Sequence, residues 1–400
     1  MSGNQVGEAA VTEVKIRLMR ESETSAIRAL MEKTFEVYLR PIFYIHPEST
    51  LVAVAGERLL GGINLDIYPI RGGAIRMGYL GWLYISEDAR GLGIGRMLVA
   101  AALDFLRKAG CSDVAACIEG DNPSSFKQLA SQGFTPLTLS GQFKRFGTSL
   151  PKVWKHASRF FDIGYFLWHK KLVGSVEQSP SATAQKTAPF EPTWKEQARS
   201  FLTTELFALA MWGILILRNQ LIPLITDTAI PILLRLLWLC FPLLAIAIRT
   251  LTMGLVARTT GLPVVYTAWD TANVLGFLFP LVIGWPFPVP GNWYRRGTAW
   301  QLAKDAQKLG IIALTTTLVE IASLAVLKTS WVQLLQSRSG AVEISLHARS
   351  AMQFLSMLCL CDTLLFFYPF CGFNASRIRR LSPWLTAATS MLLLVVIVFL

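Results

Sequence analysis

The chain has 400 residues, which is enough for two domains. Hydrophobic residues make up 52% of it and charged residues 16%, a composition that is too apolar for an ordinary soluble protein and too charged for a pure transporter. The formal net charge of +12 would suggest nucleic acid as a partner of a soluble protein, but no basic-aromatic motif accompanies it. We therefore expect the basic residues to lie beside membrane segments, and no nucleic-acid partner.

Cysteine and histidine spacing gives no sign of a metal site. The six cysteines and four histidines are scattered, and no cysteine pair has zinc-site spacing with histidines nearby. We expect no structural metal. The N-terminal stretch is polar and has no apolar core, so it does not read as a signal peptide. The first part of the chain is therefore expected in the cytoplasm, in reducing conditions.

Apolar periodicity predicts alternating strands and helices in the first 150 residues. Alternation of apolar and polar residues favours strands, and apolar spacings of three and four favour helices. The run 75–85 is longer and more apolar than the other strand candidates, so it should lie in the middle of a sheet. We expect strands at 14–20, 49–55, 59–68, 75–85 and 113–118, helices at 21–39, 91–108 and 123–131, and a closing hairpin of strands 134–139 and 142–146.

A glycine-rich loop between strand 75–85 and helix 91–108 carries the strongest chemical signal. Glycines let the backbone approach a ligand closely, and the free N–H groups at a helix start favour a pyrophosphate. Arg90 and Arg96 flank the loop and can add charge-assisted hydrogen bonds. The spacing is neither that of a GxxxxGK[ST] phosphate loop nor that of a dinucleotide-binding GxGxxG.

This stretch resembles motif A of the GNAT family of N-acetyltransferases, whose signature is R/Q-x-x-G-x-G/A. Arg90, Gly93 and Gly95 match the signature position for position. A second block, which begins at Asn122 and ends at Gly133-Phe134, also agrees with the family in order and interval. The resemblance covers residues 15–146, and it implies an α/β GNAT-like acyltransferase domain with acetyl-CoA as the acyl donor and no metal.

The resemblance also implies which residues contact acetyl-CoA. Backbone N–H groups of the loop would hold the pyrophosphate, backbone groups of the preceding strand would pair with the pantetheine and polarise the thioester, and a side chain of the second block would contact the CoA arm. The implied contacts are Leu83, Tyr84, Ile85, Arg90, Gly91, Leu92, Gly93, Ile94, Gly95, Arg96 and Asn122.

Direct attack of an amine on the thioester needs a neutral amine, and hence a base or a water chain. The candidate bases are Glu119, Asp121 and Tyr84. The two carboxylates also fit loop positions that cap the short helix, and the tyrosine also fits a core position. Many family members carry a tyrosine seven residues after the asparagine as the acid for the CoA thiolate, but this chain has Leu129 there. Another group then serves, the thiolate leaves unaided, or activity is lost.

Residues 151–173 mix aromatic residues with lysine and arginine, which suits an amphipathic segment at a membrane interface. A helix packed on the first domain fits the same residues. Residues 174–198 are rich in serine, alanine, threonine, glutamine and proline, which is typical of a flexible linker.

Residues 199–400 read as an all-α, multi-span membrane domain with about five to six spans. The run 206–217 is short for a crossing and fits an interfacial or re-entrant segment. Two basic loops, one around Arg295 and one around Arg377, should be cytoplasmic. Five spans with the C-terminus outside satisfy this rule. The apolar runs are 229–249, 266–286, 309–327, 350–370 and 383–400.

Several charged residues lie within or beside these apolar runs, where they face protein or water rather than lipid. Gly284–Pro290 and Asn374–Arg377 resemble the membrane core of site-two-protease-like metalloproteases. The family's zinc-binding HExxH helix is replaced by Arg249–Met253, and Asn374 stands in place of the third zinc ligand. The resemblance therefore implies a non-catalytic relative. The charged residues are Glu205, Arg235, Arg249, Glu320 and Asp362.

We interpret the sequence as an integral membrane protein whose cytoplasmic domain, residues 1–150, is a GNAT-type N-acetyltransferase. It would transfer an acetyl group from acetyl-CoA to an amine acceptor, which membrane tethering would favour if the acceptor is itself membrane-associated. The alternative is an acetyl-CoA-binding sensor that controls a transporter-like or protease-like membrane domain. Turnover with an amine discriminates the two.

Overall fold

The computed structural model of the chain describes residues 13–159, 162–172, 192–222, 225, 232–297, 301–337 and 342–399. The chain divides into two compact units. The first contains Met1–Cys117, Lys127–Ala157 and Leu167–Thr187, and the second contains Ile118–Phe126, Ser158–Phe166 and Ala188–Leu400. Two short connections of the first fold, residues 118–126 and 158–166, thus belong to the second unit by their contacts.

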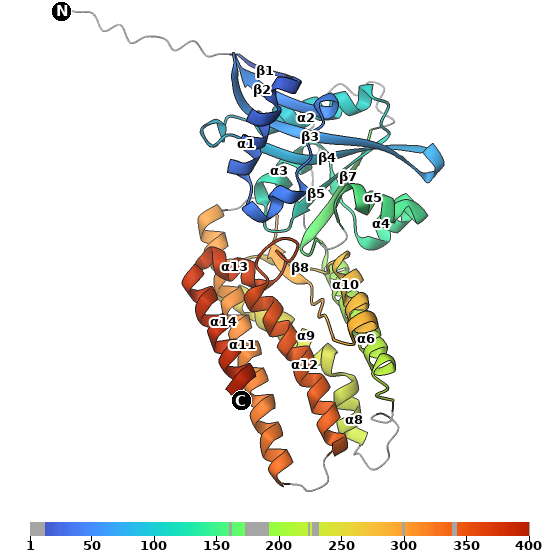
Figure 1. The fold of residues 1–400 in the computed structure, drawn as a ribbon, viewed down its shortest axis with the longest axis vertical. Helices are drawn as coiled ribbons and strands as arrows, with labels where there is room; N and C mark the ends of the chain where they lie inside the picture. The colour runs from blue at the N-terminus through green and yellow to red at the C-terminus, as the bar shows by residue number, and fades with distance from the viewer. Residues whose placement is uncertain are drawn as a thin grey trace, which may run out of the picture. The chain divides into compact units, whose positions relative to one another are not determined.

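The first unit is built on a seven-stranded mixed sheet with the order β1-β2-β3-β4-β5-β7-β6 (Figure 1). Strands β1 to β4 are antiparallel neighbours, whereas β4 and β5 are parallel. The expected central position of 75–85 is confirmed, since β4 is flanked by strands on both sides. The strands are β1 Val14–Leu18, β2 Thr50–Ala55, β3 Arg58–Ile70, β4 Ile75–Ile85, β5 Asp113–Glu119, β6 Thr135–Pro136 and β7 Tyr165–Lys171.

Helices α1 Thr24–Thr34 and α2 Ile94–Lys108 pack on the sheet. A Cβ atom added at Gly78 would lie 2.8 Å from the Leu106 side chain, so α2 approaches β4 closely at this glycine. Ile27 and Met31 of α1 are buried in a separate cluster with Val52 and Tyr84. The expected helix 21–39 ends earlier, at Thr34, because the chain becomes extended at Phe35 and then forms a short 3-10 turn that contains Pro41.

At the end of this fold, one expectation is wrong and one is met in part. The hairpin expected at 134–146 is instead the two-residue strand β6 and helix α4 Leu139–Phe146, which Thr138 caps by accepting a hydrogen bond from the Gly141 N–H. The segment 151–173 was expected either at a membrane interface or as a helix packed on the first domain. The second alternative is met in part, since helix α5 Leu150–His156 packs on β3, but strand β7 follows it. Strand β7 lies between β5 and β6, and its residues from Phe166 to His169 are buried, so this run is sheet interior.

The second unit is helical, apart from a small antiparallel pair of strands (Figure 1). Helix α11 packs against α9, α12, α13 and α14, and α6 packs against α9. Most of the expected linker 174–198 lies outside the described residues. The elements are α3 Pro123–Ser131, which both units share, α6 Trp194–Arg218, α8 Ile232–Leu239, α9 Phe241–Thr259, β8 Val264–Thr267, α10 Ala272–Leu278, β9 Asn292–Arg295, α11 Leu302–Ser337, α12 Val342–Leu364, α13 Asn374–Leu381 and α14 Pro383–Phe399.

Three helices among the described residues are long and apolar enough to cross a membrane: α6, α9 and residues 303–330 of α11. The expectation that 206–217 is too short is therefore wrong. The helix that contains it begins earlier, at Trp194, after a capping box formed by Thr193 and Glu196. The span expected at 266–286 is also not one long helix, because β8, α10 and a π-helical turn share those residues.

Candidate functional site

The glycine-rich loop forms the start of α2, as expected. Gly91 has φ +82° and Gly93 has φ +79°, left-handed values that favour glycine. Gly93 is the N-cap of α2, and no side chain caps the helix. The helical ladder begins with the Met97 N–H donating to the Gly93 carbonyl. The N–H groups of the first turn, together with the positive end of the helix dipole, therefore face outward from an exposed loop.

Strand β4 has an irregularity beside this loop. Its pairing with β3 advances by two residues on β3, from Ile63 to Leu65, while β4 advances by three, from Leu83 back to Leu80. Such a bulge bends the strand and re-aims its side chains. On the other side, the pairing of β4 with β5 ends at Leu80 and Ala116, although β4 continues to Ile85.

The parting of β4 and β5 leaves the last residues of β4 without a ladder partner on that side among the described residues. Unpaired strand edges bind extended ligands through main-chain hydrogen bonds. Leu83 and Ile85, expected to pair with the pantetheine, are partly exposed at this edge. The loop that contains Arg90 follows, Arg96 lies in the first turn of α2, and both arginines are exposed.

Tyr84 occupies a core position. Its side chain is fully buried, and its hydroxyl donates to the Asn64 side-chain oxygen at 3.1 Å. Burial raises the pKa of Tyr84 well above its usual value, so the hydroxyl stays protonated. The expected role as a candidate base is therefore not supported by its surroundings.

Glu119 and Asp121 belong to the second unit and form ion pairs there with arginines of α13. Arg377 contacts Asp121 through two hydrogen bonds of 2.8 and 3.0 Å, and Arg380 pairs with Glu119. Burial raises the pKa of Glu119, and the neighbouring Arg380 opposes that rise. Both carboxylates are therefore engaged by arginine side chains of the second unit.

Asn122 and Leu129 have plain local roles. The side-chain oxygen of Asn122 accepts a hydrogen bond from the Ser125 N–H at 3.1 Å, which caps the start of α3. Leu129, which occupies the position of the family's tyrosine acid, is buried. A Cβ atom added at Gly95 would lie 3.0 Å from the Gln128 side chain, so α2 and α3 approach closely at this glycine.

The first unit also contains a histidine–aspartate pair that no pattern in the sequence indicates. The Nδ1 atom of His156 lies 2.6 Å from the Oδ2 atom of Asp66, and both side chains are partly exposed. The His156 ring stacks on Tyr68, with centroids 3.6 Å apart. Asp66 pairs with Tyr79 of β4, two residues before the bulge. Ninety residues separate the two partners, so only the fold brings them together.

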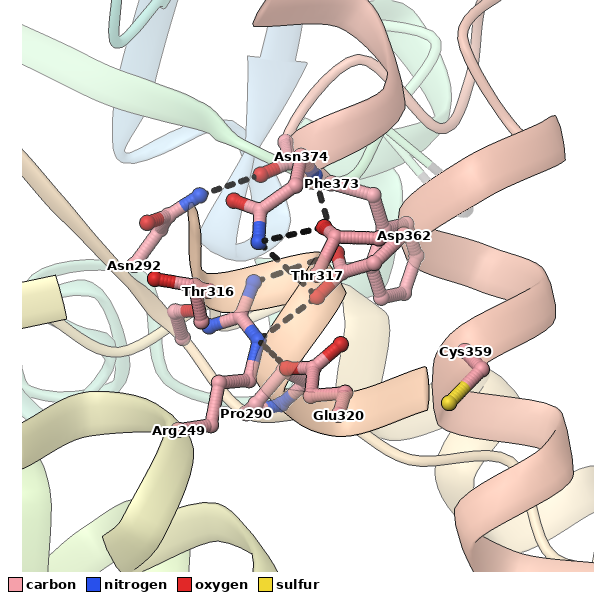
Figure 2. Close-up of polar contacts among 12 residues, drawn as sticks. Arg249, Pro290, Asn292, Thr316, Thr317, Glu320, Cys359, Asp362, Phe373 and Asn374 are labelled. Atoms are coloured by element: carbon pink, nitrogen blue, oxygen red, sulfur yellow. Dashed lines mark hydrogen bonds and ion pairs between the residues drawn. The ribbon is translucent and has the colours of Figure 1, made fainter. Parts of the chain in front are cut away.

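The second unit contains a buried cluster of charges (Figure 2). Arg249 of α9 donates to both carboxylate oxygens of Asp362 in α12, at 2.8 and 3.2 Å, and its Nε lies 3.2 Å from Glu320 of α11. Asn374 donates to the same carboxylate through its backbone N–H at 2.8 Å and its side-chain amide at 3.0 Å. Three charged residues singled out from the sequence, together with Asn374, thus meet at one point.

The guanidinium of Arg249 lies at the centre of this cluster and contacts both carboxylates. Among the described residues, no three histidine, cysteine, aspartate or glutamate side chains gather as metal ligands would. Arg249 and Asn374, which stand where the metalloprotease resemblance has zinc ligands, both contact Asp362. Arg235 lies apart from the cluster and donates to the Ile225 carbonyl.

Comparison with known families supports the interpretation of the first unit. Residues 16–134 match the family model described as the acetyltransferase (GNAT) family. A mycothiol acetyltransferase from Rhodococcus jostii is 33% identical over 94 residues, which are 23% of this chain and 31% of that protein. An N-alpha-acetyltransferase 30 from Schizosaccharomyces pombe is 30% identical over 94 residues, 23% of this chain and 62% of the relative. The chain thus spans about a third of the mycothiol acetyltransferase it matches.

Solved structures give matches of the same kind. The NatC complex bound to Gag peptide and CoA contains a chain that is 20% identical, with a TM-score of 0.30, 40% coverage of this chain and 99% of that chain. A GNAT family acetyltransferase from Brucella melitensis in complex with acetyl-CoA is 26% identical, with a TM-score of 0.21, 26% coverage of this chain and 75% of that chain.

Proposed function

We propose that the chain transfers the acetyl group of acetyl-CoA to a primary amine, starting from the match of residues 16–134 to the acetyltransferase (GNAT) family model. One observation carries the proposal: an uncapped helix start lies in a loop that directly follows a strand whose edge is unpaired. The first feature suits a pyrophosphate and the second an extended amide chain. Coenzyme A joins those two chemical parts in one molecule.

Acetyl-CoA would bind along this path without a metal. The N–H groups of Gly93, Ile94 and Gly95 would hold the pyrophosphate, with Arg90 and Arg96 adding charge from the loop. The end of β4 would pair with the pantetheine. A backbone N–H at Leu83 or Ile85 would then donate to the thioester carbonyl and stabilise the oxyanion that forms when the amine attacks.

The amine must lose a proton during the attack, and we propose His156 as the base. Its Nδ1 is held by Asp66, so Nε2 is the nitrogen left to accept a proton, and the carboxylate would stabilise the resulting imidazolium. The collapse of the tetrahedral intermediate expels the CoA thiolate. A thiol has a pKa of about 8.5, so the thiolate can leave without the tyrosine acid that Leu129 replaces.

The second unit would hold the domain at a membrane. The candidate spans α6 and α9 precede Arg295, so an even number of crossings keeps that basic loop on the side of the first unit. Helices α11 and α12 would cross out and back, which returns Arg377 of α13 to the same side, and α14 would leave the C-terminus opposite. The basic loops and the acetyltransferase domain would then be cytoplasmic, with α6 as a crossing in place of the expected span 266–286.

An acetyl-CoA sensor without turnover is the second candidate. It is favoured by the ion pairs of Glu119 and Asp121 with arginine and by Leu129 in place of the tyrosine, because these leave the expected acid–base groups occupied or absent. A sensor would bind acetyl-CoA tightly yet release no CoA in the presence of any amine. An enzyme would release CoA in step with the acetylated amine.

The acetyl-CoA assignment is tested by a matched pair of glycine variants on one helix. Gly93 and Gly110 lie at opposite ends of α2, with φ of +79° and +77°, and a Cβ at either would meet open space. Gly93→Glu and Gly110→Glu therefore add the same strain and the same charge. We expect Gly93→Glu to raise the Kd for acetyl-CoA at least about tenfold, some 1.4 kcal/mol, because the carboxylate would occupy the pyrophosphate site.

Calorimetric titration of the full chain in detergent gives both Kd values. Gly110→Glu should bind acetyl-CoA like the parent protein. If the two folded variants bound acetyl-CoA equally well, the pyrophosphate would not bind at the start of α2, and the proposed function would lose its basis.

A further inference from the structure

Two connections of the acetyltransferase fold make their contacts with the helical part of the chain. Residues 118–126 join β5 to α3, and residues 158–166 join α5 to β7, yet both segments belong to the second unit. Their ends continue covalently into β5, α3 and β7 of the first unit. Both connections are held by contacts with other residues of the second unit.

The β5–α3 connection is held by charge. Asp121 accepts two hydrogen bonds from Arg377, at 2.8 and 3.0 Å, and the side chains are 6% and 3% exposed. Arg380 pairs with Glu119 and also lies 3.9 Å from Asp121. Paired hydrogen bonds between guanidinium and carboxylate fix orientation as well as distance, and burial strengthens them. The next residue is Asn122, the cap of α3.

Arg377 is itself rigidly placed. Its remaining donors reach the Asn292 side-chain oxygen at 3.1 Å and the Trp293 carbonyl at 2.7 Å, and its guanidinium lies over the Tyr294 ring. A side chain with so many partners has little rotamer freedom to lose when it binds a carboxylate. The Arg377–Asp121 ion pair, called the joint below, is therefore held in one geometry, unlike a mobile ion pair on the surface.

Helix α13 is anchored in turn by the buried cluster of Figure 2. Asn374, the first residue of α13, donates twice to Asp362, and Asp362 is held by Arg249. An unbroken series of contacts therefore runs from Arg249 through Asp362 and α13 to Asp121. Each step joins a different element: α9, α12, α13 and the β5–α3 connection.

The second connection is held as closely. Arg159, which is fully buried, donates to Asp162 at 2.9 Å and to Asp270 at 2.8 Å. The Ile163 N–H donates to the Pro369 carbonyl at 2.7 Å. A Cβ atom added at Gly164 would clash with the backbone of Gly372, so the two chain segments touch at glycine.

From these contacts we infer that Arg377 and Arg380 are positioning residues for acetyl transfer: they hold the β5–α3 connection, which presents Asn122 and the start of α3, in its working conformation. The inference rests on the proposed function. It gives the helical part a role in the reaction besides attachment. The residues act through Asp121 and Glu119 and do not touch the reacting atoms themselves.

The test uses the full chain in detergent and three variants. Two of them change residues of α13, and the third changes Asp121, to which Arg377 binds. Arg377→Ala removes the joint, Asp121→Asn removes the carboxylate charge with little change of shape, and Arg379→Ala is the control. Arg379 is exposed on α13 and contacts the Phe366 ring instead of the connection. Amide hydrogen exchange of residues 118–126 reports the joint, and CoA release from acetyl-CoA with a short peptide carrying a free α-amino group reports the reaction.

We expect Arg377→Ala and Asp121→Asn to speed exchange in residues 118–126 at least about tenfold and to lower kcat by a similar factor, with the KM for acetyl-CoA changed less than about threefold. The double variant should lose no more than the worse single one, because both changes break one contact. Arg379→Ala should match the parent protein in both measurements.

Three outcomes would overturn the inference. Unchanged exchange in Arg377→Ala would mean that the arginine does not hold the connection. Faster exchange with unchanged kcat would mean a purely structural contact. A parent protein that neither binds acetyl-CoA nor releases CoA would overturn the proposed function as well. The hydrogen-exchange data would then report only whether Arg377 holds residues 118–126.

Discussion

His156 is the residue on which the proposed chemistry depends most. Replacing it with alanine removes the proton acceptor and leaves the α2 loop and the β4 edge intact. We expect His156→Ala to lower kcat by about a hundredfold, the usual contribution of a general base, while the Kd for acetyl-CoA stays within about twofold. Steady-state assays of CoA release measure kcat, and calorimetric titration measures the Kd for acetyl-CoA.

His46→Ala is the matched control, because His46 is an exposed histidine of the same unit that lies 3.9 Å from Glu48. It should leave kcat unchanged. Asp66→Asn should lower kcat less than His156→Ala, since it removes the orienting group but keeps the base. If His156→Ala had the same kcat as the parent protein, His156 would not be the base and another group would accept the proton.

Asp113 gives the first unit a defined acid sensitivity. The side chain is fully buried; burial opposes ionisation, but hydrogen bonds from His169, Arg145 and Ser112 outweigh it and lower the pKa of Asp113 to about 2. A carboxylate with a depressed pKa contributes stability above its unfolded value of about 4, and that contribution is lost as the pH falls towards 2. It amounts to about 2 kcal/mol.

Asp113→Asn should therefore lower the melting temperature at pH 7 and flatten its decline between about pH 5 and pH 2. Thermal unfolding of the full chain across this range measures both effects. A parallel pair of curves for the variant and the parent protein would show that Asp113 carries no linked proton.

At the scale of elements, the cluster of Arg249, Glu320 and Asp362 joins α9, α11 and α12. Arg249→Met would leave two buried carboxylates without their cation, and breaking such a pair costs about 3 to 5 kcal/mol. Arg258→Met is the control, because Arg258 lies on the same helix α9 and is exposed. Thermal unfolding in detergent should show a clear loss for Arg249→Met alone. Equal melting temperatures would mean that the cluster adds no stability.

The elements with a strong local signal were predictable from the sequence. Helix α2 begins at a glycine loop and ends near Gly110, and the structure places it at Ile94–Lys108 inside the expected 91–108. Strand β4 occupies the expected 75–85, and α3 the expected 123–131. Glycines with a positive φ and an asparagine cap are residue-level signals that do not depend on distant contacts.

The elements that depend on distant partners were not predictable. Strand β7 has buried residues on both faces, so it shows no alternation, and its mixture of aromatics and lysines is also typical of an interface. In α4, Gly141 obscured the spacing of Leu139, Phe143 and Phe146 that marks a helix. The His156–Asp66 pair and the Arg377–Asp121 joint cross 90 and 256 residues, and no local pattern reports such contacts.

The whole molecule is proposed to span a membrane, and this makes a labelling prediction. Cysteines introduced at Lys144, Gln301 and Arg379, all exposed, should react with an impermeant maleimide from the same side of sealed vesicles. A cysteine added after Leu400 should react from the other side. An even number of crossings before Gln301 requires this pattern.

Lys144 marks the side of the first unit and serves as the internal reference. If Gln301→Cys reacted from the side opposite to Lys144→Cys, one of α6 and α9 would not cross. Reaction of every position from one side would remove the membrane-spanning arrangement and leave the apolar helices as a packed domain or a surface-bound one.

Incubation of the full chain with radiolabelled acetyl-CoA and a membrane extract of its source tests directly whether the protein transfers acetyl groups to an amine. We predict that label enters an amine-bearing molecule in a form that resists hydroxylamine, as an amide does, and that Gly93→Glu abolishes this transfer. Bound acetyl-CoA with no label transferred would contradict an enzyme and support the sensor. Label that hydroxylamine removes would mean that the acceptor is a hydroxyl or a thiol.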